Sequence, residues 1–534
     1  MAGFDAVFVG SGVNSLAGAA LLAKDGWRVC VLERNDWLGG AIKTVEGLTA
    51  PGFTHEVFSS WHPLWVGSPA YAELKPDLDR LGLEYLNTDL PTATVFPDGS
   101  SAHLSTDGAA NVAELGEAWQ RQFDQFMAGA DIAFGALGTE LWSGQGLSLG
   151  RKAYRQLGRR GLVEFAGHTL LSARDWVTDT FDREEAHGLL APWVLHTGLG
   201  PDQAVSGFMT QVIACALQLG GMPVPRGGGV KLVDGLAAIV REAGGELRTE
   251  ADVERIVVSE GRATGVRLQD GETIPATRAV LACVTPTQLY GRLLGDSEAP
   301  PHVRDAAARF RYGRGEMQIH IAMNELPLWR GDERLARTPL LHLTPGLDGV
   351  SRAVNEAERG LFPAEATIAL GQPMALDPSR APGGSWVIWV QLQELPQRLK
   401  GDAAGELDTS AGWTEELREA YADRIVERIG RHIENLERAT IARVVMSPAD
   451  MEAANPNWVG GDIYAGSCAL DQNLLFRPTP ASPGHGTPVD RLWHIGASTH
   501  PGPGLGAGSG YLVAKQLTKP ALVRRLLAKV PGLP

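Results

Sequence analysis

The fold of this chain is decided by residues 5–33, which read DAVFVGSGVNSLAGAALLAKDGWRVCVLE. Two short apolar segments, Asp5–Val9 and Arg28–Leu32, have the length and composition of buried strands. The Ala- and Leu-rich segment between them, Val13–Lys24, predicts a helix that stops at Gly26, a residue suited to a helix C-terminus. We therefore expect a strand–helix–strand unit at the start of an α/β fold.

The turn between the first strand and the helix contains Gly10-Ser11-Gly12. Gly10 permits a tight turn, and Gly12 lets the backbone approach a pyrophosphate, which the N–H groups and dipole of the helix N-terminus stabilise. Glu33 closes the second strand, at the spacing where a carboxylate accepts hydrogen bonds from an adenosine ribose. Because a glutamate selects a free 2′-hydroxyl, FAD or NAD would satisfy this site and NADP would not.

Two further glycine-rich segments favour FAD. Gly39-Gly40-Ala41 follows Glu33-Arg34 closely and would bring backbone near the diphosphate and ribitol of a longer cofactor. Residues 493–510 read WHIGASTHPGPGLGAGSG, which predicts a strand, a glycine-dense turn and a helix. The N-terminus of that helix would stabilise negative charge on the pyrimidine edge of a reduced flavin. No Cys or His stands in a recognisable flavin-attachment context, so we expect FAD to be bound non-covalently.

The rest of the chain predicts two interleaved domains. A strand meander over 253–275, an apolar strand over 279–284 and a strand over 492–495 continue the nucleotide-binding unit. We expect an α/β fold, with a Rossmann-type FAD-binding domain of the glutathione-reductase-like kind interleaved with an α+β substrate domain. The FAD-binding segments are 1–84, 221–290 and 458–534, and the substrate-domain insertions are 85–220 and 291–457. The nearly apolar helix predicted over 208–219 is expected to be buried and to line a substrate cavity.

Composition excludes several functions. The formal net charge of −14 argues against a nucleic-acid partner, because phosphate binding needs a basic face. The four cysteines, Cys30, Cys215, Cys283 and Cys468, show neither a C-x-x-C pair nor metal-ligand spacing, so we expect no disulfide, metal site or dithiol chemistry. The N-terminus lacks the pattern of a secretory leader, and no apolar run reaches membrane-span length, so a cytoplasmic location is expected.

Two basic segments bear on a peripheral membrane contact. The first contains Arg151, Lys152, Arg155, Arg159 and Arg160, and we interpret it as a solvated helix face, with a membrane-surface contact as the alternative. The second is a C-terminal amphipathic segment with Leu517, Lys519, Arg524, Arg525 and Lys529. Here too a helix packed on the domain is the favoured interpretation, and peripheral contact with a membrane is the alternative.

These motifs together resemble the phytoene desaturase-like branch of the FAD-dependent amine oxidases and carotenoid desaturases. The chain is especially similar to the pyridine nucleotide-disulfide oxidoreductase domain-containing group of that branch. The resemblance extends over nearly the whole chain in the same order. The residues that carry it are Gly10, Gly12, Asn14, Glu33, Arg34, Gly39, Gly40, Pro51-Gly52-Phe53, Gly227-Gly228-Gly229, Asp471-Gln472, Arg477-Pro478 and residues 496–502.

The resemblance implies cofactor contacts for individual residues. It implies pyrophosphate contacts for Gly10, Gly12 and Ser15, with Val13 and Asn14 in the same turn, an adenosine-ribose contact for Glu33, and a ribitol contact for 39–41. It also implies a backbone contact of Val253 with the adenine, and contacts of Gly496, Ala497, Gly504, Leu505 and Gly506 with the far end of the cofactor. Ser15 replaces a glycine of the family pattern, and Tyr511 stands where the group often has Arg followed by Asn.

The sequence indicates the residues that act on the substrate less clearly than those that bind the cofactor. His500 is a candidate base, because the resemblance places its loop beside the flavin, although a structural histidine is equally consistent. Ser59, Ser60 and His62 follow Pro51-Gly52-Phe53 and are candidates for contact with flavin or substrate, with an ordinary loop histidine favoured for His62. Trp61, Trp65 and Trp193 are candidate walls of an apolar pocket, although aromatic side chains are more often plain core.

The predicted activity is an FAD-dependent dehydrogenase or desaturase that removes hydride from an apolar or ring substrate and forms a C=C or C=N bond. A second dinucleotide motif is missing, so we expect electrons to pass to oxygen, a quinone or a carrier protein. Three alternatives stay open: a flavin amine oxidase, a redox-neutral isomerase, and a non-catalytic binder of prenyl chains or lipids like the GDP dissociation inhibitors. The intact segment 496–510 argues against the binder, which has no need to hold an isoalloxazine.

Overall fold

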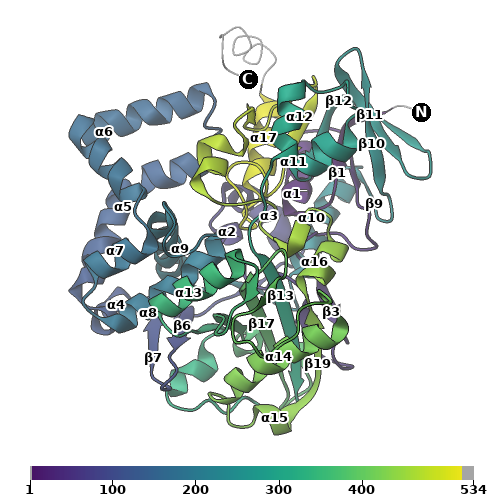
Figure 1. Cartoon of the computed structure of the whole chain (residues 1–534). Helices are drawn as coiled ribbons and strands as arrows, with labels where there is room; N and C mark the ends of the chain where they lie inside the picture. Colours follow the sequence, from purple (N-terminus) through teal and green to yellow (C-terminus); the bar gives the residue numbers. More distant parts are fainter. Residues whose placement is uncertain (1–2, 520–534) are drawn as a thin grey trace.

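A computed structural model describes residues 3–519 as two seven-stranded sheets with a helical region beside them (Figure 1). The strands of the first sheet come from 4–32, 246–283 and 492–495, and those of the second from 92–104 and 315–446. The two units therefore interleave along the chain. This confirms the predicted class, a Rossmann-type α/β domain interleaved with an α+β domain, while the exact domain boundaries stay a prediction.

The first sheet combines a parallel part with an antiparallel meander. Its strand order is β10-β11-β12-β1-β2-β9, with β22 pairing β12 in parallel. The strands are β1 (Phe4–Val9), β2 (Val29–Leu32), β9 (Glu246–Arg248), β10 (Val253–Ser259), β11 (Arg262–Leu268), β12 (Thr273–Cys283) and β22 (Leu492–Ile495). The end of the predicted meander and the strand predicted over 279–284 are in fact one strand, since β12 pairs with the meander through its first residues and with β1 through the rest.

Helices cover one face of this sheet and the meander lies towards the other. α1 (Val13–Lys24), α3 (Pro69–Arg80), α10 (Val230–Glu242) and α17 (Gly508–Thr518) bury their apolar side chains in one core with β1 and β2. α1 forms at its predicted residues because Ala and Leu fill it and ten of its twelve residues are buried. The chain order strand–glycine turn–helix therefore places the N-terminus of α1 at the edge of the sheet.

The second sheet has the order β19-β13-β17-β16-β14-β6-β7. Its strands are β6 (Thr92–Val95), β7 (Ser101–Leu104), β13 (Gly315–Met323), β14 (Leu340–Leu343), β16 (Ile368–Gly371), β17 (Trp386–Leu395) and β19 (Thr440–Met446). α14 (Glu415–Gly430) covers one face through Leu417, Tyr421, Ile425 and Ile429. The opposite face of β13 and β17 is turned towards the first domain and lines the site described below.

The first insertion, residues 85–220, is mainly helical. It contains α4 (Gly108–Leu115), α5 (Glu117–Leu137), α6 (Gly144–Thr169), α7 (Ala173–Thr180), α8 (Glu184–Leu190), the 3₁₀ segment η1 (Ala191–Thr197) and α9 (Ser206–Gly220). α5 and α6 extend away from the two sheets (Figure 1). The predicted apolar helix is α9, and most of its side chains are buried.

The remaining elements are short or join the two domains. They are β3 (Thr44–Glu46), β4 (Thr54–Glu56), α2 (Pro63–Val66), β5 (Tyr85–Leu86), β8 (Val224–Pro225), α11 (Pro286–Gln288), η2 (Leu289–Leu293), α12 (Pro301–Ala308), η3 (Glu333–Arg337), α13 (Leu347–Glu358), β15 (Leu361–Phe362), η4 (Pro373–Ala375), η5 (Pro378–Arg380), β18 (Gly401–Asp402), α15 (Leu436–Ala439), α16 (Pro448–Ala454), η6 (Val459–Gly461), η7 (Leu470–Gln472), η8 (Leu474–Phe476), β20 (Pro478–Thr479) and β21 (Ser482–Pro483). No helix within residues 3–519 has the length and apolar character needed to span a membrane.

The structure describes the first basic segment of the sequence fully and the C-terminal one only in part. Arg151, Lys152, Arg155, Arg159 and Arg160 are all exposed on α6, in agreement with a solvated helix face. In the C-terminal segment, Leu517 is buried in α17 against the first core. Arg524, Arg525 and Lys529 lie outside the described residues.

Candidate active site

A cavity of about 340 Å³ lies between the two sheets. Its lining includes the glycine turn after β1, the end of β2, the start of β10, α9, the facing side of β13 and β17, and the loop before α17. The cavity therefore joins the predicted dinucleotide site to the substrate domain. Dinucleotides bind at this edge of a Rossmann-type sheet, beyond the carboxyl ends of the parallel strands.

The first two glycine-rich segments meet at one end of this cavity. Gly12 and Gly39 form a β-bridge, and the N–H of Gly39 donates a hydrogen bond to the Ser11 carbonyl at 3.2 Å. A Cβ on Gly40 would lie 3.1 Å from the Cα of Gly12, so the close approach of the two backbones requires glycine. The N-terminus of α1 has no side-chain cap. Its N–H groups are therefore placed to receive the oxygens of a pyrophosphate.

Glu33 lines the same end of the cavity and is held in one orientation. Its Oε2 accepts hydrogen bonds from the Ser11 N–H at 3.0 Å and the Ser11 hydroxyl at 2.7 Å, and its Oε1 accepts one from the Asn35 N–H at 3.0 Å. The side chain is 6% exposed. A carboxylate fixed in this way at the end of β2 is suited to bind ribose hydroxyls. Val253 also lines this end, and Arg292 donates a hydrogen bond to its carbonyl at 2.9 Å.

The loop before α17 supplies another wall through Ala497, Ser498 and Pro503–Leu505. This loop is tied to α1, because the Ser509 hydroxyl donates a hydrogen bond to Asn14 Oδ1 at 2.8 Å. It is also tied to residues 464–477 through the buried Arg477. The Arg477 guanidinium donates hydrogen bonds to the Ala497 carbonyl at 2.8 and 3.0 Å and to the Tyr464 carbonyl at 3.3 Å. These contacts indicate that Arg477 of the Arg477-Pro478 motif holds the loop in place.

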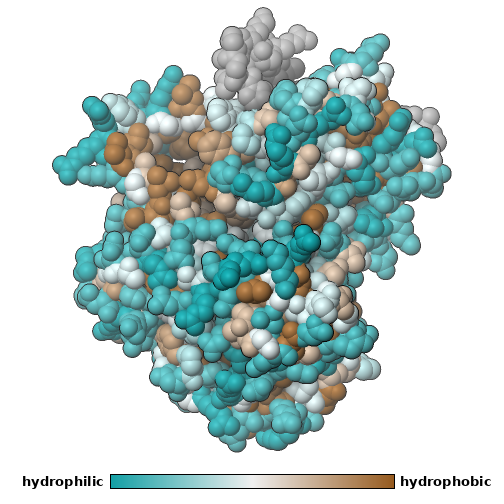
Figure 2. All heavy atoms as spheres, in the orientation of Figure 1, coloured by the Kyte–Doolittle hydropathy of each residue, from teal (hydrophilic) through white to brown (hydrophobic). Residues whose placement is uncertain are grey.

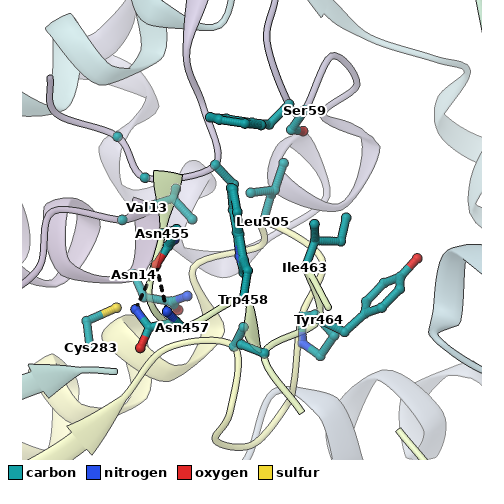
Figure 3. A pocket seen from close by; sticks show the side chains of 18 of the residues that line it. Val13, Asn14, Ser59, Cys283, Asn455, Asn457, Trp458, Ile463, Tyr464 and Leu505 are labelled. Carbon is teal, nitrogen blue, oxygen red and sulfur yellow. Dashed lines mark hydrogen bonds between the residues drawn. The ribbon is translucent and has the colours of Figure 1, made fainter. Parts of the chain in front are cut away.

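Residues 455–458 line the middle of the cavity, and no sequence motif indicated them. Asn457 Oδ1 accepts a hydrogen bond from the Thr285 N–H at 2.9 Å, and its amide nitrogen donates to Asn455 Oδ1 at 3.1 Å. Figure 3 shows Trp458 between Asn14 and Tyr464, and the Asn455–Asn457 bonds drawn beside Asn14. Trp458 also packs edge-on against Phe58, with ring centroids 4.9 Å apart. These positions become recognisable only when the second insertion folds back onto the first domain.

The end of the cavity next to the second sheet is walled by large apolar side chains. Trp61 and Trp193 line it as expected, together with Ile213, Ala216 and Leu217 of α9. Trp389 and Leu340, which the sequence did not indicate, come from β17 and β14. Trp65 is instead fully buried in the core of the first domain. The prediction that α9 lines a cavity is confirmed.

The two candidate catalytic histidines are not among the residues that line the cavity. His62 is 1% exposed, and its Nδ1 is hydrogen-bonded to the Tyr85 hydroxyl at 3.0 Å. Burial and the Arg380 charge lower the pKa of His62 to about 3. His500 Nε2 donates to the Ala136 carbonyl of α5 at 2.9 Å, and the His500 carbonyl is bonded to His485 at 2.8 Å. Other residues of the His500 loop line the cavity, but neither histidine side chain does within the described structure, so the geometry gives no support to either as a base.

The other predicted site residues form two groups, those that line the cavity and those that do not. Those that line the cavity are Gly10, Gly12, Val13, Asn14, Glu33, Arg34, Gly39, Gly40, Ala41, Ser60, Val253, Ala497, Gly504 and Leu505. Ser15, Gly496 and Gly506 are not among the lining residues. The Gly496 N–H is bonded to Ser509 Oγ at 2.8 Å, and the Ser15 hydroxyl is buried. Gly506 packs against Leu64 and therefore contributes to the packing of the loop.

The residues present fit FAD. Glycine turns, an uncapped helix N-terminus, a fixed carboxylate and a second glycine-rich loop all face one cavity, and these are the groups that hold an adenosine diphosphate and a flavin. Charged side chains in the described lining are Glu33, Arg34, Asp252 and Arg292. They gather at the end of the first sheet, where the predicted adenosine site lies.

Comparisons with known proteins show the family of this chain and support a flavin cofactor. Residues 16–367 match the family model "Flavin containing amine oxidoreductase". The chain is 27% identical to mouse pyridine nucleotide-disulfide oxidoreductase domain-containing protein 2, over 95% of this chain and 92% of the mouse protein. It is 22% identical to a subunit of the limonene dehydrogenase of Castellaniella defragrans, over 96% and 94% of the two chains. It is 24% identical to the neurosporene-forming phytoene desaturase of Rhodobacter capsulatus, over 96% and 93%.

Among solved structures, an oxidoreductase from Methanosarcina mazei shares the fold with a TM-score of 0.60 and 14% identity, over 96% of this chain and 99% of that one. The family match covers more than half of the chain, and the resemblance to phytoene desaturases inferred from the motifs is confirmed. The chain therefore belongs to the flavin containing amine oxidoreductase family and is an FAD-dependent oxidoreductase.

Proposed function

We propose that this chain is a dehydrogenase or desaturase that removes hydride from an apolar or ring substrate and forms a C=C or C=N bond. The observation that carries the proposal is the continuity of one cavity from the glycine turns to a chamber walled by Trp61, Trp193 and Trp389. Such a chamber holds a carbon skeleton by burying its surface and excludes water from the reacting bond. Relatives named as a limonene dehydrogenase component and a phytoene desaturase support the proposal.

Bound FAD would supply the acceptor for the hydride. The chain's own residues then have two tasks, to orient the substrate against the flavin and to keep water out. We propose that FAD is held non-covalently. Among the described lining residues the only cysteine is Cys283 and the only histidine is His196. Cys283 lies beside Gly12 at the predicted pyrophosphate end, and burial raises the pKa of its thiol to about 11, so the reactive thiolate is scarce.

The first experiment is the visible spectrum of the purified protein, repeated on the supernatant after acid precipitation. Flavin bands that pass into the supernatant are expected, and flavin that stays with the precipitate would contradict non-covalent binding. The holoenzyme is then mixed anaerobically with apolar alkenes and with cyclic ketones. Loss of the oxidised flavin absorbance with either class supports a dehydrogenase.

A flavin amine oxidase is the second candidate, because the description of the matching family names amines. Rapid hydrogen peroxide release with primary amines, without flavin reduction by alkenes or ketones, would establish it in place of the dehydrogenase. Membership of an oxidoreductase family leaves the non-catalytic prenyl binder without support. A colourless protein that also fails to take up added FAD would revive that alternative.

The electron acceptor is proposed to be oxygen, a quinone or a carrier protein. The reduced holoenzyme is exposed to air and, separately, to a soluble quinone. Reoxidation by air indicates oxygen, reoxidation by the quinone alone indicates a quinone, and reoxidation by neither indicates a carrier protein.

Peripheral membrane contact is proposed at the helical arm of α5 and α6, where Leu147, Tyr154 and Val163 are 56–67% exposed beside the basic residues of α6. Hydrophobic residues gather around this arm in Figure 2. Flotation with anionic liposomes tests the contact, and recovery only in the bottom fraction would refute it.

A further inference from the structure

Beside Trp389, the second sheet presents buried polar side chains to the cavity. Three glutamines line it, Gln318 from β13 and Gln391 and Gln393 from β17, and we call them the glutamine wall. Gln318 and Gln391 are direct partners across the two strands. The side chains are 0%, 6% and 4% exposed, respectively. Buried amides of this kind are costly in free energy unless each donor and acceptor finds a partner.

The alternation of side chains along β13 and β17 places the glutamines on one face of these strands only. Side chains alternate along a strand, and the opposite face of β13 and β17 is formed by Met317, Ile319, Val390 and Leu392, all buried in the apolar core under α14. The cavity face instead carries Gln318 on β13 and Gln391 and Gln393 on β17, next to Trp389. An apolar side chain would pack equally well against a hydrocarbon substrate. A cavity built for a pure hydrocarbon therefore gains nothing from the three amides.

Gln318 is the member of the wall that has no partner. Neither its amide nitrogen nor its amide oxygen has a hydrogen-bond partner within the described structure. The other two glutamines are engaged: the Gln391 amide donates to Glu316 at 2.5 Å, and the Gln393 amide donates to the Tyr464 hydroxyl at 2.9 Å. A neutral amide offers both two N–H donors and a carbonyl acceptor, so Gln318 can bind a group that accepts, donates or does both.

Within the described structure no charged side chain lines the cavity beside the wall, and Arg314 and Asp462, which act on the nearby Glu316, are not among the lining residues. Burial, followed by the charge of Asp462, raises the pKa of Glu316 well above its usual range, which favours the neutral form of this carboxyl. His196 and His342 are bonded through their Nε2 atoms at 2.9 Å, and burial lowers the pKa of both below their usual range. The charged lining residues within the described structure are all at the opposite end. An ammonium or carboxylate group would be desolvated here without a counter-charge.

From this juxtaposition we infer that the substrate is an uncharged molecule with an apolar body and a carbonyl or hydroxyl oxygen, which Gln318 binds. The inference rests on the proposed dehydrogenase function and names its substrate class. The three tryptophans hold the body, and the glutamine wall fixes the oxygen. The wall thereby sets which carbon of the substrate is presented for oxidation. A plain hydrocarbon or an amine of the same skeleton binds more weakly.

The test uses the FAD-loaded enzyme and matched probes that share one skeleton: 2-decalone, 2-decalol, decalin and 2-aminodecalin, with cyclohexyl and camphane sets added. Binding to the oxidised enzyme is followed by perturbation of the flavin spectrum, and reduction by anaerobic bleaching. Ketone or alcohol probes are expected to bind about tenfold or more tightly than the matching hydrocarbon or amine in at least one set. A panel in which no oxygen-bearing probe binds more tightly than its hydrocarbon partner overturns the inference.

The variant Gln318→Met keeps the side-chain length and removes both polar groups. It is expected to lose the preference for the ketone while keeping the affinity for the hydrocarbon. The matched control is Gln211→Met on α9, another buried glutamine, which is bonded to Gln122 and His168 and is not among the cavity-lining residues. A preference that survives in Gln318→Met overturns the assignment of this residue. If that variant does not fold, Gln393→Met and the comparison of probes on the wild type decide instead.

The two readouts separate this inference from the proposed function. Oxygen-bearing probes that bind with the expected preference, in a protein that no probe or alkene reduces, would contradict the dehydrogenase and support the subsite. A hydrocarbon that binds and bleaches the flavin as well as its ketone partner would support the dehydrogenase and overturn the subsite.

Discussion

The hydroxyl of Ser509 donates a hydrogen bond to Asn14 Oδ1 at 2.8 Å, and this bond joins two residues that are 495 positions apart. Asn14 belongs to the first turn of α1, and Ser509 to the first turn of α17. The same Ser509 oxygen accepts a hydrogen bond from the Gly496 N–H at 2.8 Å. One hydroxyl therefore holds the first and last glycine-rich segments together at the cavity.

We predict that Ser509→Ala weakens flavin binding by about tenfold and lowers the free energy of unfolding by about 1–2 kcal/mol, because the buried Gly496 N–H loses its acceptor. Fluorescence titration of the apoprotein with FAD and chemical denaturation measure the two effects. Ser148→Ala, at an exposed position on α6, is the control and is expected to change neither. Wild-type affinity and stability in Ser509→Ala would show that the bond is incidental.

Glu33→Gln tests the predicted ribose contact. The substitution keeps the shape of the side chain but removes the charge that strengthens the bonds to Ser11 and to ribose hydroxyls. We expect the dissociation constant for FAD to rise by about tenfold, which corresponds to about 1.4 kcal/mol. The exposed Glu46→Gln on β3 serves as the matched control. Equal flavin-to-protein ratios in dialysed Glu33→Gln and wild type would exclude the contact.

His500→Gln separates a structural histidine from a catalytic one. Loss of the Nε2 bond to the Ala136 carbonyl should cost about 1–2 kcal/mol of stability. The pH dependence of flavin reduction, measured with the compound that reduces the wild type, should stay unchanged because the side chain does not line the cavity. Loss of one ionisation from that pH profile would restore His500 as a base.

Arg477→Lys tests whether the hydrogen bonds of Arg477 hold the loop before α17 in place. A lysine keeps the charge but lacks the planar fork that reaches the carbonyls of Ala497, Ser467 and Tyr464. Since Arg477 is 1% exposed, the unpaired carbonyls would stay buried, and we expect a loss of about 3 kcal/mol in the free energy of unfolding. Flavin release during thermal melting should start earlier than in the wild type. Arg431→Lys, on the surface, is the control, and a melting curve as unaffected as that of this control would refute the role.

Glu394 makes stability depend on pH. Burial raises its pKa from 4.5 to about 8, against the hydrogen bonds from Thr367 that lower it. The folded state therefore keeps a proton that the unfolded state loses above about pH 4.5, and stability falls as the pH rises from about 4.5 to about 8. The slope is at most about 1.4 kcal/mol per pH unit.

In Glu394→Gln this decline should be absent, so the variant gains stability relative to the wild type as the pH approaches 8. Denaturation midpoints at pH 5, 6.5 and 8 measure the difference. Glu437→Gln, exposed on α15, should follow the wild type. Parallel pH curves for wild type and Glu394→Gln would show that Glu394 ionises normally in the folded protein.

The local elements were accessible from the sequence because their signals lie within a few residues of one another. The turn at Gly10 and Gly12, the helix α1 and the carboxylate of Glu33 belong to one strand–helix–strand unit, whose spacing carries its own geometry. The family resemblance added the pairing of this unit with the loop before α17. The continuous β12 was missed because its two halves face different neighbours, and no local pattern records a change of partner within one strand.

By itself, then, the sequence determined the nucleotide-binding unit, the family and the class of cofactor, since glycine, a helix N-terminus and a carboxylate act through short-range geometry. Only the tertiary structure decided the other half of the site. Trp458, Gln318 and Trp389 reach the cavity because a second sheet folds back over the first domain, and His500 leaves it because its ring is bonded to a distant helix. Such contacts depend on side-chain direction between segments hundreds of residues apart, which no local pattern in a single sequence encodes.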